Sequence, residues 1–330
     1  MKDFFIEDAP KFDGAVVTSF FALSSFSVRD KKANGGQYLA LILSDKTGSL
    51  EARMWDEIDS AVATCEEGCY VKAQGQIAKY QGKFQITLTK LRLAATSEID
   101  AKDFVPATKF DIGEMWAELR GYVDAFQNAD LRRLVFAFLD DEAIGEAYRE
   151  APAAKVLHHA WIGGLLEHVL TLVRVCRATA PFYPEVDPDL LVTGAILHDI
   201  GKIRELSWGT TFSYTLEGQL IGHISIAQAM LREKLFTLPG FPDKLRVLVE
   251  HMILSHHGKY EFGSPKLPMT PEAILLSALD DIEAKMQAMR NEFGRDVASG
   301  KSGAEMTDWV RSMERPLLNT KAFLDEKQSS

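Results

Sequence analysis

The sequence predicts a multidomain α and β protein in which an N-terminal five-stranded β-barrel precedes an all-α domain. Two observations support this fold class. Apolar and polar residues alternate in several short runs before residue 105, a pattern typical of strands. From about Asp111 onward, apolar residues recur at steps of three and four, which is typical of helices. The change of period places the domain boundary near residues 100–112.

The strands of the barrel are separated by clear turn signals. Asn34-Gly35-Gly36 and Asp45-Lys46-Thr47-Gly48 lie between the first three runs, and Gln81-Gly82 lies between the last two. A helical insert near 56–65 separates the third strand from the fourth. Five strands with a helix in that position are typical of an OB-fold, a small barrel that binds oligonucleotides. The expected strands lie within 16–30, 37–45, 49–56 and, as a pair, 66–94.

The barrel also carries a local basic surface, although the whole chain has a net charge of −10 that disfavours indiscriminate binding of nucleic acid. No acidic residue lies between Lys72 and Arg92, and the basic residues of this stretch are Lys72, Lys79, Lys83, Lys90 and Arg92. We expect Lys79, Lys83 and Lys90 to contact phosphates and Tyr80 to stack on a base. Tyr38, Trp55 and Phe84 are further stacking candidates, but we interpret Trp55 and Phe84 as barrel core.

The helical part is divided by its capping signals. We expect residues 1–105 to form the OB-fold domain and 106–152 to form a helical linker region that packs on the next domain. Residues 153–295 are expected to form the main helical domain, and 296–330 a C-terminal tail with one short helix within 307–318. Asp187-Pro188 is a helix start, and Gly201 marks the end of the same helix as a left-handed residue. Thr270-Pro271 starts another helix, which is expected to reach about Arg290.

All eight histidines lie between residues 158 and 257, and none lies in the predicted barrel. Several of them, and also Asp280, interrupt or end apolar helical stretches, as His198 does in AILHDIGK. A buried imidazole or carboxylate without a partner is costly, and a divalent ion satisfies several such groups at once. Imidazole and carboxylate without thiolate suit manganese, iron, zinc or nickel. The sequence therefore predicts a metal centre in the helical domain.

The order His168, His198-Asp199, Asp280 resembles the H…HD…D pattern of the HD superfamily of metal-dependent phosphohydrolases, and HDIGK is its most specific piece. The additional His223 and the His256-His257 pair resemble the two-metal branch of that superfamily. The strings HHAWIGGLLEHV, YTLEGQLIGHISIA and LSHHGKYEFGSPKLP resemble the YhaM-type 3′–5′ exoribonucleases, in which an OB-fold precedes an HD domain. The resemblance covers roughly residues 10–290.

The resemblance implies two divalent ions, with manganese the first expectation. One ion is expected on His168, His198, Asp199 and Asp280; the other is expected on His223, His256 and His257, with Asp199 bridging. Asp281 is the alternative to Asp280, because neighbouring side chains on a helix point about 100° apart and cannot both reach one ion.

At one position the sequence departs from part of the superfamily. Some two-metal relatives carry a further acid one turn before the first histidine, where this chain has Gly164. No third ion is expected.

Asp199, Lys202 and His223 are the expected catalytic residues. Two neighbouring cations activate a water molecule and stabilise the charge that builds on phosphate oxygens. Lys202 is expected to hold a phosphate oxygen; its other interpretation is a cation that balances a helix C-terminus. His158 and His159 are expected at the substrate or as supports of the ligands, and Lys266, in the segment 263–268, is expected to contact substrate.

The function that this resemblance implies is hydrolysis of single-stranded RNA from its 3′ end, with single-stranded DNA left open as a substrate. One alternative is a nucleotide or cyclic-dinucleotide phosphohydrolase whose OB-fold serves assembly; others are a nucleic-acid-binding protein with an inactive HD site and a regulatory metal-dependent binder of nucleotides. Three cysteines and no signal peptide or membrane span predict a cytoplasmic protein. Homo-oligomer formation is left open.

Overall fold

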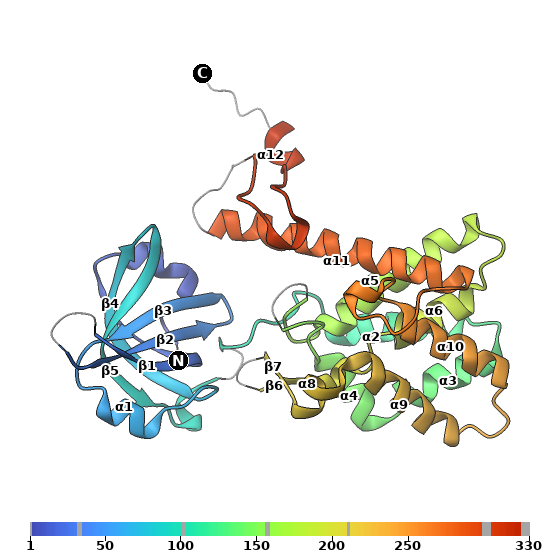
Figure 1. The fold of residues 1–330 in the computed structure, drawn as a ribbon, viewed down its shortest axis with the longest axis horizontal. Helices are drawn as coiled ribbons and strands as arrows, with labels where there is room; N and C mark the ends of the chain where they lie inside the picture. The colour runs from blue at the N-terminus through green and yellow to red at the C-terminus, as the bar shows by residue number, and fades with distance from the viewer. Residues whose placement is uncertain are drawn as a thin grey trace. The chain divides into compact units, whose positions relative to one another are not determined.

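The computed structural model describes residues 2–31, 35–100, 103–155, 159–209, 212–298 and 305–324. The chain divides into two compact units, Met1–Ala107 with Trp208–Ser213, and Thr108–Ser207 with Tyr214–Ser330 (Figure 1). A β-barrel dominates the first unit and helices dominate the second, which confirms the predicted fold class. Within the described ranges, no helix combines the length and the apolar character needed to cross a bilayer.

The first unit is a closed barrel with the strand order β1-β2-β3-β5-β4. Strands β3 and β5 are parallel, whereas the other neighbouring strands are antiparallel. Helix α1 falls between β3 and β4, as the OB-fold prediction requires. The elements are η1 (Ile6–Phe12), β1 (Val16–Asp30), β2 (Gln37–Asp45), β3 (Gly48–Met54), α1 (Asp59–Thr64), β4 (Tyr70–Tyr80), β5 (Lys83–Leu93) and η2 (Thr96–Glu98).

Alternation along the strands builds the barrel core. Leu39, Leu41 and Leu43 of β2 are buried, while the residues between them are only partly covered. The two-residue turn Gln81-Gly82 has positive φ at both positions (48° and 83°), the geometry that matches the twist of a hairpin. It sets Tyr80 opposite Lys83 at the tip of the β4–β5 hairpin.

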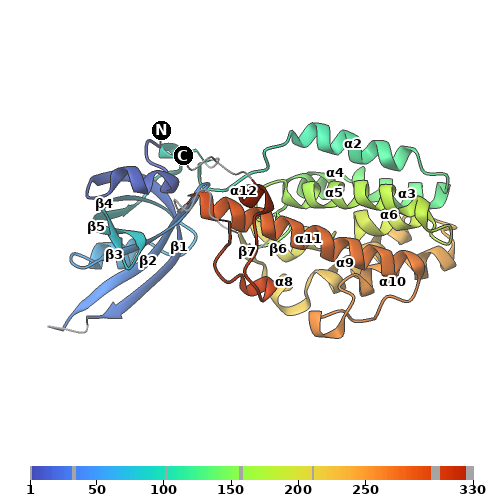
Figure 2. The same ribbon diagram turned by 90° about the horizontal axis from the view of Figure 1, so that it is seen from above.

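The second unit is a helical bundle. Helices α5 and α6 pack against each other, and α11 packs against both (Figures 1 and 2). Its helices are α2 (Ile112–Asp124), α3 (Ala129–Leu139), α4 (Glu142–Glu150), α5 (Gly164–Thr179), η4 (Ala180–Phe182), α6 (Pro188–Leu197), α7 (Lys202–Glu205), α8 (Leu216–Ile221), α9 (His223–Phe236), α10 (Asp243–Ser255), η5 (Tyr260–Phe262), α11 (Pro271–Ala298), η6 (Arg311–Met313) and α12 (Thr320–Leu324). The short strands β6 (Leu206–Trp208) and β7 (Phe212–Tyr214) each contain residues of both units.

The predicted start of α6 is confirmed, but its predicted end is wrong. The Asp187 side chain accepts hydrogen bonds from the backbone N–H groups of Asp189 and Leu190, and Pro188 is the first helical residue. The helix ends at Leu197, and Gly201 has φ −63°, which is not left-handed. Glycine is needed there for space, because a Cβ would lie 2.0 Å from the His223 carbonyl oxygen.

Two further predictions at the C-terminal end need correction. Helix α11 runs to Ala298, beyond the expected end near Arg290. The segment 307–318 is not a helix: it is closed by the bridges Met306–Leu318 and Val310–Arg315 around the single turn η6. The short helix of this region is α12, which starts after Leu318.

Candidate metal centre

Five separate segments of the second unit bring the predicted ligands together. His168 lies on α5, His198 and Asp199 follow α6, His223 begins α9, His256 and His257 follow α10, and Asp280 lies on α11. Helix α6 is buried from Asp189 to Leu197, so its C-terminal end delivers His198 and Asp199 to the centre of the unit. His168, His198, Asp199 and His256 are each at most 3 % exposed.

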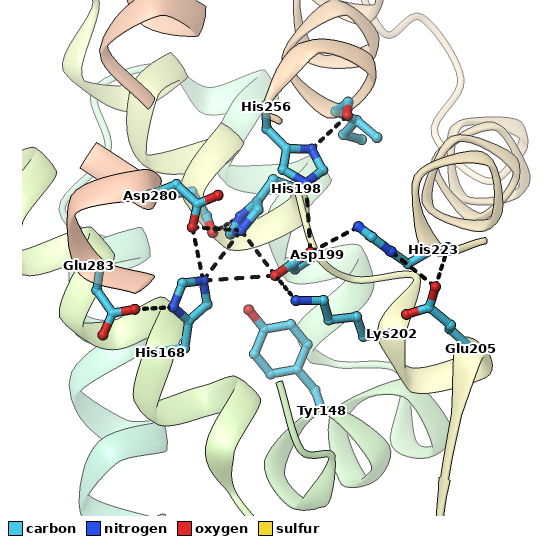
Figure 3. A network of polar contacts seen from close by, with 12 residues as sticks. Tyr148, His168, His198, Asp199, Lys202, Glu205, His223, His256, Asp280 and Glu283 are labelled. Atoms are coloured by element: carbon cyan, nitrogen blue, oxygen red, sulfur yellow. Dashed lines mark hydrogen bonds and ion pairs between the residues drawn. The ribbon is translucent and has the colours of Figure 1, made fainter. Parts of the chain in front are cut away.

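Asp199 lies between two sets of imidazoles, as Figure 3 shows. Its Oδ2 atom is 3.2 Å from Nε2 of His198 and 3.8 Å from Nε2 of His168. Its Oδ1 atom is 3.5 Å from Nε2 of His223 and 3.8 Å from Nε2 of His256. The two carboxylate oxygens therefore face different groups of nitrogen atoms.

Two groups of close ligand atoms flank Asp199. His168, His198 and Asp280 form one, in which Oδ1 of Asp280 is 3.3 Å from Nε2 of His168. His223, His256 and His257 form the other. The structure thus brings together all seven side chains that were predicted as metal ligands.

Hydrogen bonds at the far nitrogen fix the orientation of the imidazoles. The Nδ1 atoms of His198, His256 and His257 each donate to a backbone carbonyl oxygen, which can only accept. Nδ1 of His168 lies 2.6 Å from Glu283, and Nδ1 of His223 lies 3.0 Å from Glu205. In the neutral form, with its proton on Nδ1, each ring presents a lone pair at Nε2, which is the state of a metal-binding imidazole.

Some of these atoms lack a hydrogen-bonding partner. In the described part of the chain, Oδ1 of Asp199 and the Nε2 atoms of His223 and His256 are buried with no hydrogen bond. Leaving such atoms unpaired costs on the order of 1–3 kcal/mol each. A divalent cation supplies what lone pairs on nitrogen and carboxylate oxygen require, so these residues fit a metal ion.

Ionisable side chains of the site have shifted pKa values. Burial alone would lower the pKa of His168, but the carboxylates of Asp280 and Glu283 raise it to about 10. Burial would raise the pKa of Asp199, but Lys202 and the neighbouring histidines hold it well below its ordinary range. Without metal, protonated His168 and Lys202 therefore balance the buried carboxylates.

Lys202 lies directly against Asp199. Its Nζ atom is 2.6 Å from Oδ2 of Asp199, and its side chain is 12 % exposed. It is the first residue of α7 and follows the end of α6 at Leu197. Figure 3 shows the Tyr148 ring nearby; this buried tyrosine donates its hydroxyl to the Ile196 carbonyl.

The sequence analysis did not identify Glu205 and Glu283. Glu283 lies three residues after Asp280, and Glu205 lies three residues after Lys202. Each glutamate is therefore about one helical turn from a residue that was predicted. A carboxylate at i+3 from a ligand on a buried helix face is the signal that could have indicated Glu283.

The other predicted site residues are placed as follows. His158 lies outside the described residues. His159 is 1 % exposed and its Nε2 is 2.8 Å from Glu283, which corresponds to a support of the ligands. Lys266 is exposed on the loop after α10. Asp281 is exposed and pairs with Lys285, so it points away from the centre.

The predicted nucleic-acid surface lies on the barrel. Tyr80 is 50 % exposed at the hairpin tip, with the Arg53 guanidinium 5.6 Å from its ring, and Lys79, Lys83 and Lys90 are exposed. The Tyr38 and Trp55 rings stack on the surface with centroids 4.6 Å apart, so the interpretation of Trp55 as core is wrong. Phe84 packs partly buried against the core.

Comparison with protein families agrees with both units. The HD domain family matches residues 165–285, which contain the seven candidate ligands. The OB-fold nucleic acid binding domain family matches residues 27–94 of the barrel. The fold and the site thus define an HD-superfamily phosphohydrolase that depends on divalent metal and carries an OB-fold nucleic-acid-binding domain.

The chain belongs to the family of the 3′–5′ exoribonucleases called YhaM. It is 35% identical to the member from Halalkalibacterium halodurans over 302 residues, 91% of this chain and 92% of the relative. It is 36% identical to the member from Bacillus subtilis over 277 residues, 84% of this chain and 87% of the relative. With the member from Listeria monocytogenes, identity is 36% over 279 residues, 84% of this chain and 88% of the relative.

Proposed function

We propose that this protein is a 3′–5′ exoribonuclease that hydrolyses single-stranded RNA with two divalent ions. The observation that carries the proposal is the position of Asp199, whose two carboxylate oxygens face two different groups of histidines. A single ion needs only one of these groups. A pair of ions with a bridging carboxylate uses both, which is the arrangement of two-metal phosphoesterases.

In this proposal His168, His198, Asp199 and Asp280 would hold the first ion, and His223, His256 and His257 would hold the second, with Asp199 available to both. Manganese is the first candidate, with iron, zinc and nickel as alternatives that the ligand types also suit. When bound, such ions lower the pKa of a water molecule, so that hydroxide is available to attack phosphorus near neutral pH. They also stabilise charge on the phosphate oxygens.

The protein's own groups position and balance the reactants. Asp199, Lys202 and His223 are the proposed catalytic residues. Lys202 gives a buried positive charge beside Asp199, and in the loaded site it would turn to a non-bridging phosphate oxygen. Glu205 and Glu283 keep His223 and His168 in the tautomer and orientation that bind metal.

The barrel supplies a reason why the substrate is a strand. A small nucleotide needs only a pocket, whereas a strand is held by stacked bases and phosphate contacts over several nucleotides. Tyr80, Lys79, Lys83 and Lys90 would form this surface, with single-stranded DNA as a second ligand. Lys266 remains our candidate for a substrate contact beside the metal centre. We propose a cytoplasmic location for this enzyme, in keeping with an RNA substrate.

The first test is degradation of a 5′-labelled single-stranded RNA by the purified full chain with manganese. We expect a ladder that shortens from the 3′ end, its loss in Asp199→Ala, and its persistence in the exposed control Asp281→Asn. Hydrolysis of small phosphodiesters with RNA left intact would contradict the proposal and favour a nucleotide phosphohydrolase.

The number of ions is tested separately by metal analysis of the loaded protein. Two ions per chain are expected, one in His257→Ala, and fewer than one in Asp199→Ala. A single ion in the unaltered protein, with RNA degradation intact, would contradict the two-metal part alone.

A further inference from the structure

A short aromatic turn follows the His256-His257 pair directly. It comprises residues 258–263, includes η5, and exposes two aromatic rings: Tyr260 is 65% exposed and Phe262 is 57% exposed. Rings of this size are normally buried when they serve the fold, and here neither is. We call residues 258–263 the aromatic turn.

The backbone of the aromatic turn is held firmly although its rings are exposed. Nδ1 of His257 donates to the carbonyl oxygen of Phe262 at 2.8 Å. The N–H of Lys259 donates to the His257 carbonyl, and the N–H of Ser264 donates to the Lys259 carbonyl. The Ser264 hydroxyl donates to the carbonyls of Leu254 and Lys266, which ties the turn to the end of α10.

Gly258 fixes the path by which the chain leaves the site. Its φ is +75°, a conformation that favours glycine, and a Cβ at this position would lie 2.4 Å from Oγ of Ser277 on α11. The turn therefore passes close to α11 where it leaves the His256-His257 pair.

This geometry places the aromatic turn one imidazole ring away from the metal centre. The Phe262 carbonyl oxygen accepts from Nδ1 of His257, and the His257 side chain belongs to the group of possible ligands with His223 and His256. A phosphodiester held at that centre brings the attached nucleoside into this neighbourhood.

The charges around the aromatic turn attract a polyanion only weakly, so its rings are the groups suited to bind a nucleotide. Lys259 lies 5.2 Å from the centroid of the Phe262 ring, but it also pairs with Glu261 at 3.4 Å. Both partners are mostly exposed, so this ion pair contributes little. Base stacking on an exposed aromatic ring does not depend on such a charge and tolerates every base.

We propose that Tyr260 and Phe262 form a stacking platform for the bases at the 3′ end of a single-stranded RNA held at the metal centre. The platform is separate from the surface on the barrel and binds the nucleotides next to the reacting phosphate. Its bond to His257 connects base binding to the orientation of a metal-ligand side chain. This inference rests on the proposed exoribonuclease function.

The test uses the full, manganese-loaded chain and an RNA that carries 2-aminopurine at its 3′ end, joined by a non-hydrolysable linkage. Stacking on an aromatic ring quenches the fluorescence of this base. We expect quenching on binding to the unaltered protein, loss of quenching in Phe262→Leu and in Tyr260→Leu, and its return in Phe262→Trp. The matched control is Phe236→Leu, which removes an 89% exposed ring at the far end of α9.

Kinetics with cleavable RNA separate the outcomes. In Phe262→Leu the KM for RNA should rise about 5- to 100-fold. This fold-change should be at least about five times any fold-change in the KM for bis(p-nitrophenyl) phosphate. Metal content should stay the same, because the main-chain carbonyl that binds His257 is retained. If the variants degrade RNA with the same KM and the same quenching as the unaltered protein, the stacking platform is refuted. If the unaltered protein leaves RNA intact, the proposed function is refuted instead.

Discussion

Glu283 accepts a hydrogen bond from Nδ1 of His168 at 2.6 Å, and its second oxygen lies 2.8 Å from Nε2 of His159. This buried carboxylate therefore orients His168, although Glu283 was not among the predicted metal ligands. The Glu283→Gln substitution keeps the size but removes the negative charge and leaves one carbonyl oxygen for the two imidazoles. Metal affinity should fall about 10- to 100-fold.

Titration calorimetry with manganese measures this change, and circular dichroism checks that the helices are retained. The matched control is Asp281→Asn, two residues earlier on α11, where the side chain is exposed. Affinity equal to that of the control would show that His168 does not need Glu283.

Asp280 and Asp281 are adjacent in sequence but differ in position. Asp280 faces His168, whereas Asp281 is exposed and pairs with Lys285. Asp280→Asn should lower kcat/KM for RNA roughly 1000-fold, equivalent to about 4 kcal/mol of transition-state stabilisation. Asp281→Asn should change it less than twofold. Steady-state kinetics on both variants would refute the assignment if their losses were similar.

Lys202 distinguishes a role at the substrate from a role in balancing charge. If it holds a phosphate oxygen, Lys202→Met should lower kcat about 100-fold, as expected for the loss of one preorganised donor. Lys202→Arg should recover part of the rate. A variant with normal kcat but a lower melting temperature in the metal-free state would instead assign Lys202 to the neutralisation of Asp199.

Metal binding should release protons. In the metal-free protein the pKa of His168 is raised to about 10, from an ordinary value of 6.5, by Asp280 and Glu283 despite its burial. His168 is therefore protonated at pH 7, and its raised pKa stabilises the metal-free fold below pH 6.5, a contribution that is lost as pH rises toward 10. Because metal needs the neutral ring, affinity should increase up to tenfold per pH unit in this window. Calorimetry in buffers of different ionisation enthalpy counts the protons, and zero release would contradict the prediction.

The barrel surface should affect strand binding and not the chemistry. Tyr80→Ala should weaken RNA binding about 5- to 100-fold through lost stacking. Each of Lys79→Ala, Lys83→Ala and Lys90→Ala should lower the slope of log affinity against log salt by roughly 0.7. Fluorescence anisotropy at several salt concentrations measures both effects. The control is Lys11→Ala, where the exposed lysine pairs with Asp8 outside this surface.

Local pattern in the sequence determined the two-part architecture and the identity of the ligand candidates. Strand and helix periods depend on neighbouring residues, so the sequence of elements in the barrel domain and the start of α6 could be predicted. The ligand residues were recognisable because imidazoles and carboxylates interrupted apolar stretches and followed a familiar order. The same local rules extended α6 too far, since the turn after Leu197 is set by the packing of Gly201 against His223, a contact between distant segments.

Only the tertiary structure decided which atoms face one another. Sequence order cannot show that the two oxygens of Asp199 meet different histidines, or that Asp280 points inward while Asp281 points out, because these facts depend on the rotation of each helix about its axis. The roles of Glu205, Glu283 and the aromatic turn were likewise decided by the tertiary structure. Their roles come from hydrogen bonds to histidines, and such bonds exist only after separate helices have packed into one core.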